Sequence, residues 1–123
     1  KIAEAKLTGG QAIEIWGDGE QTRSFCHVDD CVEGIYRLML SDHGEPLNLG
    51  TEQLISINNL ARLIIEISGK QDVTLEHVPG PQGVRGRNSD NTRLRAVLGW
   101  EPGITLEVGL QETYRWINKQ VNG

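Results

Sequence analysis

Gln21 and Arg23 are the residues whose types and spacing point most directly to chemistry. They stand two positions apart in the run Trp16-Gly-Asp-Gly-Glu-Gln-Thr-Arg-Ser-Phe25, directly after a turn built on two glycines. In an extended segment, side chains two positions apart share one face, so a carboxamide and a guanidinium would face the same ligand. A guanidinium binds phosphate oxygens through paired hydrogen bonds. With Thr22 between them, these residues form the first candidate site for a nucleotide diphosphate.

A second basic cluster, Arg85 and Arg87, lies far downstream in a glycine-flanked loop. The neighbouring glycines would let the backbone approach a ligand closely. Two separated basic loops in an otherwise acidic chain suggest a polyanionic ligand that is held from two sides. The alternative is that these arginines are ordinary surface charges, whose ion pairs contribute little to stability. Arg23 in particular could pair with Asp18 or Asp29.

Both loops match one family of enzymes. The pattern Gly-Asp-Gly-x-Gln-x-Arg-x-Phe-x-x-Val-Asp-Asp, at residues 17–30, resembles the substrate-binding region of the extended short-chain dehydrogenases/reductases, the NAD-dependent epimerase/dehydratase family. Within that family, the run that begins at Trp16 and the run Pro79-Gly-Pro-Gln-Gly-Val-Arg-Gly-Arg-Asn-Ser-Asp-Asn91 are most similar to epimerases that act on GDP-mannose. Leu98-Gly-Trp-Glu-Pro102 and Tyr114-Arg-Trp-Ile117 also fit. The resemblance covers essentially the whole chain, but only the C-terminal third of such an enzyme.

The resemblance implies a nucleotide-sugar substrate, with GDP-mannose favoured, and an intact enzyme that uses NAD and forms a homodimer. It implies that Arg87 contacts the pyrophosphate, with Arg85 as a weaker second choice. It also implies that Arg23 contacts the diphosphate or the ribose, and that Gln21 donates a hydrogen bond to the sugar or the phosphate. Lys1 corresponds to a family lysine that reaches the substrate from the preceding helix, although Lys6 competes for that alignment.

Two motifs of the resembling enzymes are absent from these 123 residues. No G-x-G-x-x-G run follows a strand and opens a helix, and neither Tyr36 nor Tyr114 has a lysine four positions later. We therefore expect a fragment without catalytic or cofactor-binding residues, inactive alone, whose Rossmann domain is missing. Other reactions of the family (4-epimerisation, decarboxylation, dehydration) and a non-catalytic nucleotide-sugar-binding module remain alternatives.

Composition is consistent with one small domain spanning residues 1–123. The net charge of −5 argues against nonspecific binding to nucleic acid, which depends on clustered positive charge. No apolar run approaches the roughly 20 residues that cross a bilayer, and no secretory signal pattern is present. These features favour a cytoplasmic protein without nucleic-acid or membrane partners.

The cysteines and histidines predict no further chemistry. Cys26 and Cys31 are the only cysteines, and we expect two reduced, partly buried thiols. Together with His27 they offer too few ligands at this spacing for a metal site. His27 itself is expected on a strand that faces solvent or a neighbouring domain. Asp29 and Asp30 are expected to cap a helix or accept structural hydrogen bonds.

The elements that must position these residues are short strands and three to four amphipathic helices, which indicates a small α/β (α+β) domain. Alternation and β-branching predict strands at residues 13–15, 24–27, 46–49, 54–55 and 73–77. Helical spacing of apolar residues predicts helices that follow His27, Ser56, Asn91 and Thr105. The first of these helices has an apolar face made of Val28, Cys31, Val32, Ile35, Leu38 and Met39.

Overall fold

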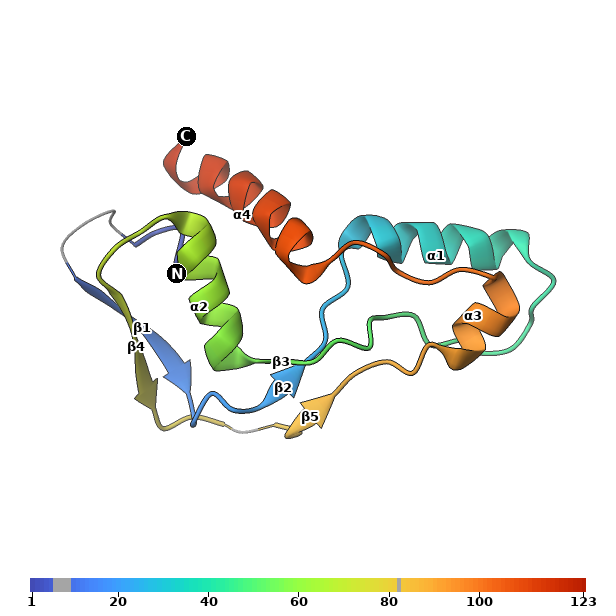
Figure 1. The fold of residues 1–123 in the computed structure, drawn as a ribbon, viewed down its shortest axis with the longest axis horizontal. Helices are drawn as coiled ribbons and strands as arrows, with labels where there is room; N and C mark the ends of the chain where they lie inside the picture. Colours follow the sequence, from blue (N-terminus) through green and yellow to red (C-terminus); the bar gives the residue numbers. More distant parts are fainter. Residues whose placement is uncertain (6–9, 82) are drawn as a thin grey trace.

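The computed structural model describes residues 1–5, 10–81 and 83–123 as a mixed arrangement of short strands and helices (Figure 1). The helices and strands follow one another as β1 (Gln11–Trp16), β2 (Thr22–Arg23), α1 (Val28–Leu40), β3 (Ile55–Ser56), α2 (Ile57–Ser68), β4 (Val73–Val78), β5 (Gly86–Arg87), α3 (Thr92–Leu98) and α4 (Leu106–Asn122). The predicted α/β class is confirmed. None of the helices in the described ranges is long and apolar enough to span a bilayer.

The strands form two small sheets. β1 and β4 pair in parallel over six residues, from Gln11 opposite Val73 to Trp16 opposite Val78. β2 is the middle strand of the other sheet, antiparallel to β3 and parallel to β5. β2 and β5 are therefore neighbours in space although more than sixty residues separate them in the sequence.

The packed part of the chain lies where α2 packs against the β1–β4 pair and α4 packs against α2 (Figure 1). Ile13 and Ile15, which alternate along β1, are both buried, as is Ala61 on α2. The ends of α2 follow the predicted pattern: the Ser56 hydroxyl accepts a hydrogen bond from the Asn59 amide, and the helix stops at a left-handed glycine. Lys70 then donates hydrogen bonds to the carbonyls of residues 2, 3 and 5, which ties the first turn of the chain to the end of α2.

Two of the predicted strands do not form. Residues 24–27 and 46–49 are extended or irregular without ladder pairing. A strand needs a neighbouring strand to satisfy its backbone groups, and the β2–β5 ladder ends once the Ser24 amide has donated to the Arg87 carbonyl. Residues 24–27 therefore serve as the approach to α1.

Helix α1 differs from the prediction in its cap and in the face that it buries. Its N-cap is His27, whose Nδ1 accepts from the amide of Asp29, so the predicted capping by a carboxylate is wrong. Asp30 is a buried acceptor for the amide of Ile104, 2.8 Å away, which confirms the predicted structural hydrogen bond. The inward face packs through Gly34, where an added Cβ would lie 2.7 Å from the Leu49 side chain. The predicted apolar stripe faces outward over much of its length; its exposed members are Val28, Val32, Ile35 and Met39.

A buried amide, Asn58 at the start of α2, bonds to the turn before β2 at several points. Its Nδ2 donates to the Asp18 carbonyl (2.9 Å) and to the Glu20 carboxylate (2.6 Å). Its Oδ1 faces Nε2 of His77 at 2.8 Å, and because a carbonyl oxygen only accepts, His77 must donate there. Its backbone amide also donates to Gly19. Asn58 therefore fixes the turn that delivers β2.

We expect Gly19→Ala to lower the free energy of unfolding by about 2–4 kcal/mol. Gly19 has a φ of +70°, and an added Cβ would lie 2.0 Å from Asn58 Oδ1, so both backbone strain and a steric clash oppose the substitution. Gly99→Ala is a matched control, because its φ of +59° is similar but nothing lies within 4 Å of the added Cβ. The control should cost about 1 kcal/mol. Urea unfolding of both variants measures the difference, and equal costs would contradict the role of Asn58.

Candidate functional site

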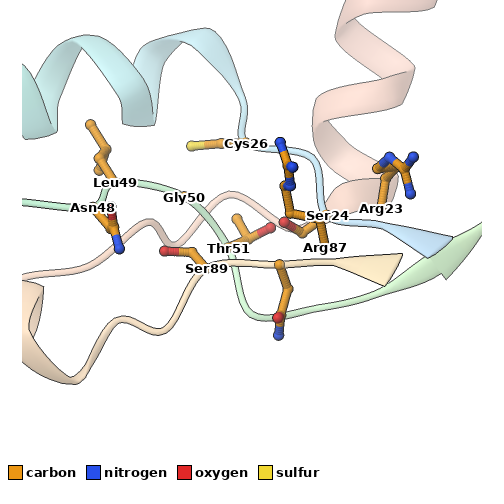
Figure 2. Close-up of a pocket in the computed structure, with 10 residues that line it drawn as sticks. Arg23, Ser24, Cys26, Asn48, Leu49, Gly50, Thr51, Arg87 and Ser89 are labelled. Atoms are coloured by element: carbon orange, nitrogen blue, oxygen red, sulfur yellow. The ribbon is translucent and has the colours of Figure 1, made fainter. Parts of the chain in front are cut away.

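An open cleft lies beside the β2–β5 pair (Figure 2). Its volume is about 470 Å³, which is within the usual range for small-molecule sites. Three segments far apart in the sequence build its walls: residues 23–26, residues 48–51 and residues 87–89. The lining residues are Arg23, Ser24, Cys26, Asn48, Leu49, Gly50, Thr51, Arg87, Asn88 and Ser89.

The β2–β5 pairing sets the two predicted arginines opposite each other. Arg23 of β2 is in direct register with Arg87 of β5, and Thr22 is in register with Gly86. The Thr22 amide donates to the Arg85 carbonyl at 2.8 Å. A Cβ at Gly86 would lie 2.9 Å from the Thr22 hydroxyl oxygen, so this glycine serves the close approach of the two strands. The prediction had assigned its freedom to the approach of a ligand.

Both arginines of the cleft lack an acidic partner within the described ranges. Neither Arg23 nor Arg87 forms an ion pair there, and Nη1 of Arg23 donates only to the Thr22 carbonyl at 2.7 Å. The alternative pairing of Arg23 with Asp18 or Asp29 is therefore not found. Two like charges on paired strands repel each other, and an anion between them removes that repulsion.

Arg85 is directed away from the cleft. Its Nη1 lies 2.9 and 3.0 Å from the two carboxylate oxygens of Asp18, in the glycine turn. The pKa of Asp18 is lowered, first by the hydrogen bond from the Glu20 amide and then by Arg85. Arg85 thus occupies the carboxylate that was the candidate partner of Arg23, and it does not line the cleft.

Gln21 and Lys1 also lie outside the lining of the cleft. Nε2 of Gln21 donates to the Trp16 carbonyl at 3.4 Å, and the backbone carbonyl of Gln21 accepts from the Ile57 amide. Nζ of Lys1 lies 3.9 Å from the carboxylate of Glu14 on β1, beside an apolar groove formed by β1, α2 and α4. Lys6, the competing lysine, is outside the described residues.

The wall made by residues 50–52 and 88–91 is organised by Asn91, which sequence reasoning treated only as a helix start. Asn91 is 2% exposed. Its Nδ2 donates to the Gly50 carbonyl (2.9 Å), and its Oδ1 accepts from the Ser89 hydroxyl (2.8 Å). Its backbone N–H donates to the Glu52 carboxylate (3.0 Å). The only sequence signal was an Asn at an N-cap position, and that signal does not predict bonds to a segment forty residues away.

Cys26 is the one thiol that lines the cleft, and it also borders a smaller apolar pocket formed with α4. Both cysteines of the chain are free and partly buried, as predicted. Burial raises the pKa of the Cys26 thiol, and nearby Cys31 and Asp30 raise it further. A raised pKa keeps the sulfur protonated and weakly nucleophilic at neutral pH, so Cys26 contributes a neutral surface.

His27, Asp29 and Glu112 are the one described group of side chains close enough together to suggest a metal ion. The Nδ1 atom of His27 accepts from the Asp29 amide, so a neutral ring carries its hydrogen on Nε2, 3.6 Å from Glu112. Neither ring nitrogen then has a lone pair available for a metal. The ring also packs on Gly109, where a Cβ would lie 3.0 Å away. His27 therefore joins the start of α1 to α4, which corrects its prediction as an outward strand residue.

The chain resembles known proteins over nearly its full length. The profile of the NAD dependent epimerase/dehydratase family matches residues 1–50. GDP-mannose 3,5-epimerase 1 of Oryza sativa subsp. indica is 47% identical over 114 residues, and GDP-mannose 3,5-epimerase of Arabidopsis thaliana is 46% identical. These matches cover 93% of this chain and 30% of each relative. The structure of a UDP-glucose 4-epimerase from Thermotoga maritima with UDP-glucose aligns with a TM-score of 0.85 at 34% identity, covering 98% of this chain and 39% of that one.

The fold and these similarities relate the chain to the extended short-chain dehydrogenases/reductases, and its first 50 residues match the model of the NAD-dependent epimerase/dehydratase family. Within that family it is a homologue of the GDP-mannose 3,5-epimerases, as the sequence motifs predicted. The chain spans about a third of the length of the relatives that it matches.

We expect the Glu52 carboxylate to stabilise the cleft wall in a pH-dependent way. The pKa of Glu52 is lowered from its ordinary value of 4.5, first by the hydrogen bond from the Asn91 amide and then by Arg95. A carboxyl with a lowered folded pKa contributes stability that is fully present above the unfolded value and is lost as the pH falls through the folded value. Glu52→Gln should therefore be less stable than the wild type at pH 7, and the difference should shrink below pH 4.5.

Urea unfolding at several pH values between neutral and strongly acidic measures this effect. Glu45→Gln, which changes an exposed loop glutamate of the same charge, is the control. A stability difference between Glu52→Gln and wild type that stays constant across the acid range would contradict the expectation.

Proposed function

We propose that this chain is the substrate-binding part of an NAD-dependent sugar-nucleotide epimerase that acts on GDP-mannose. In this proposal Arg23 and Arg87 hold the diphosphate of the nucleotide between them. The high identity to GDP-mannose 3,5-epimerases supports the choice of substrate. The larger share of such an enzyme lies beyond these residues, so the reaction is proposed for the whole protein.

The observation that carries the proposal is the register of β2 and β5. It sets two arginines, which have no acidic partner among the described residues, directly opposite each other at one open cleft. A diphosphate carries at least two negative charges and several acceptor oxygens, which two guanidinium groups can match bidentately. Polar groups from residues 48–51 and 88–89 line the space next to the arginines, where the remainder of a nucleotide sugar would extend.

Holding the diphosphate contributes to a reaction at a distant carbon of the sugar. Binding energy from a non-reacting part of a substrate restricts its position and orientation relative to the catalytic groups. The chain supplies no dinucleotide loop and no Tyr-x-x-x-Lys pair, so its residues do not fit NAD and no proton transfer is assigned to them. We propose that the chain alone is inactive and that a Rossmann domain completes the enzyme.

The other properties of the intact enzyme follow from the same assignment. We propose a cytoplasmic homodimer, with NAD bound by residues outside this chain. The proposed substrate site of the intact enzyme extends beyond the described cleft and includes Gln21, Thr22, Arg85 and Lys1. Arg85 can exchange its ion pair with Asp18 for a substrate contact, because a surface ion pair contributes little to stability.

We expect Arg87→Ala to weaken the binding of GDP-mannose about 10- to 100-fold, the effect of losing a charge-assisted contact of about 1.5–3 kcal/mol. Arg23→Ala should have a similar effect. Arg85→Ala is a closely matched control, because it removes the same charge two residues away from a side chain that pairs with Asp18. The control should change the affinity less than about threefold. Isothermal titration calorimetry at low and moderate salt measures all three variants.

If the Arg85 and Arg87 variants lose equal affinity for GDP-mannose, binding depends on the overall charge of the loop and not on the cleft arginines. UDP-glucose, titrated in parallel, distinguishes GDP-mannose from the substrates of related 4-epimerases. Tighter binding of UDP-glucose would overturn the proposed substrate but leave the arginine pair in place. A folded chain that binds neither ligand would overturn the proposed diphosphate grip.

A further inference from the structure

The cleft beside the arginine pair has a second wall with the opposite hydrogen-bonding character. We propose that Thr51 and Ser89 present only acceptor atoms to a bound ligand, so that this wall selects hydrogen-bond donors next to the arginine-held anion. The position of the anion rests on the proposed function above. The donor preference rests on the hydrogen bonds of the wall itself.

The hydroxyl proton of Thr51 is already committed. Its Oγ1 donates to the backbone carbonyl of Phe25 at 3.1 Å, and a carbonyl oxygen can only accept. Oγ1 therefore keeps its lone pairs but has no hydrogen left to give. Thr51 lines the cleft on the segment that faces residues 87–89 (Figure 2).

The hydroxyl proton of Ser89 is committed in the same way, to Asn91. The orientation of the Asn91 amide is determined by its neighbour, because its Nδ2 donates to the Gly50 carbonyl at 2.9 Å. Its other atom, Oδ1, must then be the acceptor of the bond from the Ser89 hydroxyl at 2.8 Å. Because Asn91 is 2% exposed, water cannot easily replace these partners.

The backbone amide of Ser89 is committed as well. The amide of Ser89 donates to the Thr51 carbonyl at 3.1 Å, which also joins the two segments. An anionic oxygen placed against the Thr51 and Ser89 oxygens would meet lone pairs without a hydrogen between them, which is unfavourable. The cleft is therefore polarised: cations at the β2–β5 side attract the anion, and the acceptor wall repels it.

The ligand that fits has a diphosphate with hydrogen-bond donors close beside it. In a nucleotide sugar, three parts could supply them: the hydroxyl groups of the hexose, those of the ribose, and the N–H groups on the edge of a guanine base. All three offer the same chemistry to the wall. An analogue that lacks the donor would cover these oxygens and leave them without a partner, so the wall disfavours it.

Titration of the chain with four ligands tests the proposal. Inorganic pyrophosphate carries the anion alone, GDP and IDP differ by the 2-amino donor of the base, and GDP-mannose adds the hexose. Thr51→Val removes one acceptor while nearly keeping the shape of the side chain, and Ser89→Ala removes the other. Each variant should weaken binding of the donor-bearing ligand about three- to tenfold and leave pyrophosphate within about twofold.

The ligand series identifies which donor is used. A GDP advantage over IDP that disappears in the variants assigns the wall to the base, and a GDP-mannose advantage over GDP that disappears assigns it to the hexose. An equal loss for GDP and IDP, with pyrophosphate unchanged, assigns it to the ribose. Variants that retain the wild-type affinities for all four ligands, with unchanged unfolding midpoints, would overturn the acceptor wall alone. Failure of Arg87→Ala to weaken pyrophosphate binding, or no binding by any ligand, would overturn the arginine grip and this proposal with it.

Discussion

The parallel pairing of β2 with β5 is the interaction on which the rest of the site depends. Only two residues of each strand take part, and the ladder is continued by bonds from the Thr22 amide to Arg85 and from the Ser24 amide to Arg87. This short ladder joins segments more than sixty residues apart and decides which side chains share a face. A shift of one residue would exchange Arg87 for a neighbour and send its side chain to the other face.

Buried amides hold that short ladder in position from both sides. Asn58 secures the glycine turn that precedes β2, and Asn91 secures the wall that follows β5. Each amide bonds to several partners from distant segments, which compensates for the small hydrophobic core: few large apolar side chains are fully buried in the described ranges. A site built from loops needs such support, because loops alone do not hold side chains to the accuracy that ligand recognition requires.

Electrostatics then separates the arginines by role. Asp18 forms an ion pair with Arg85 in the turn, and Glu52 of the cleft wall forms one with Arg95. Arg23 and Arg87 are the cleft arginines without such a carboxylate partner in the described ranges. The overall negative charge of the chain gives no indication of this, because the local arrangement of charged partners and not the sum of charges sets the electrostatic potential at the cleft.

The sequence by itself determined the family resemblance, the fold class, and the local elements whose signals lie within a few residues. Short-range patterns predict the helix caps at Ser56 and Thr105 and the helix ends at Gly69 and Gly99. Both basic loops are recognisable by composition. The tertiary structure alone decided that Arg23 and Arg87 are paired while Arg85 is not, that His27 caps α1, and that Asn58 and Asn91 organise the cleft. Those outcomes depend on contacts between residues far apart in the chain. A one-dimensional pattern carries no information about which distant partner satisfies a given polar group.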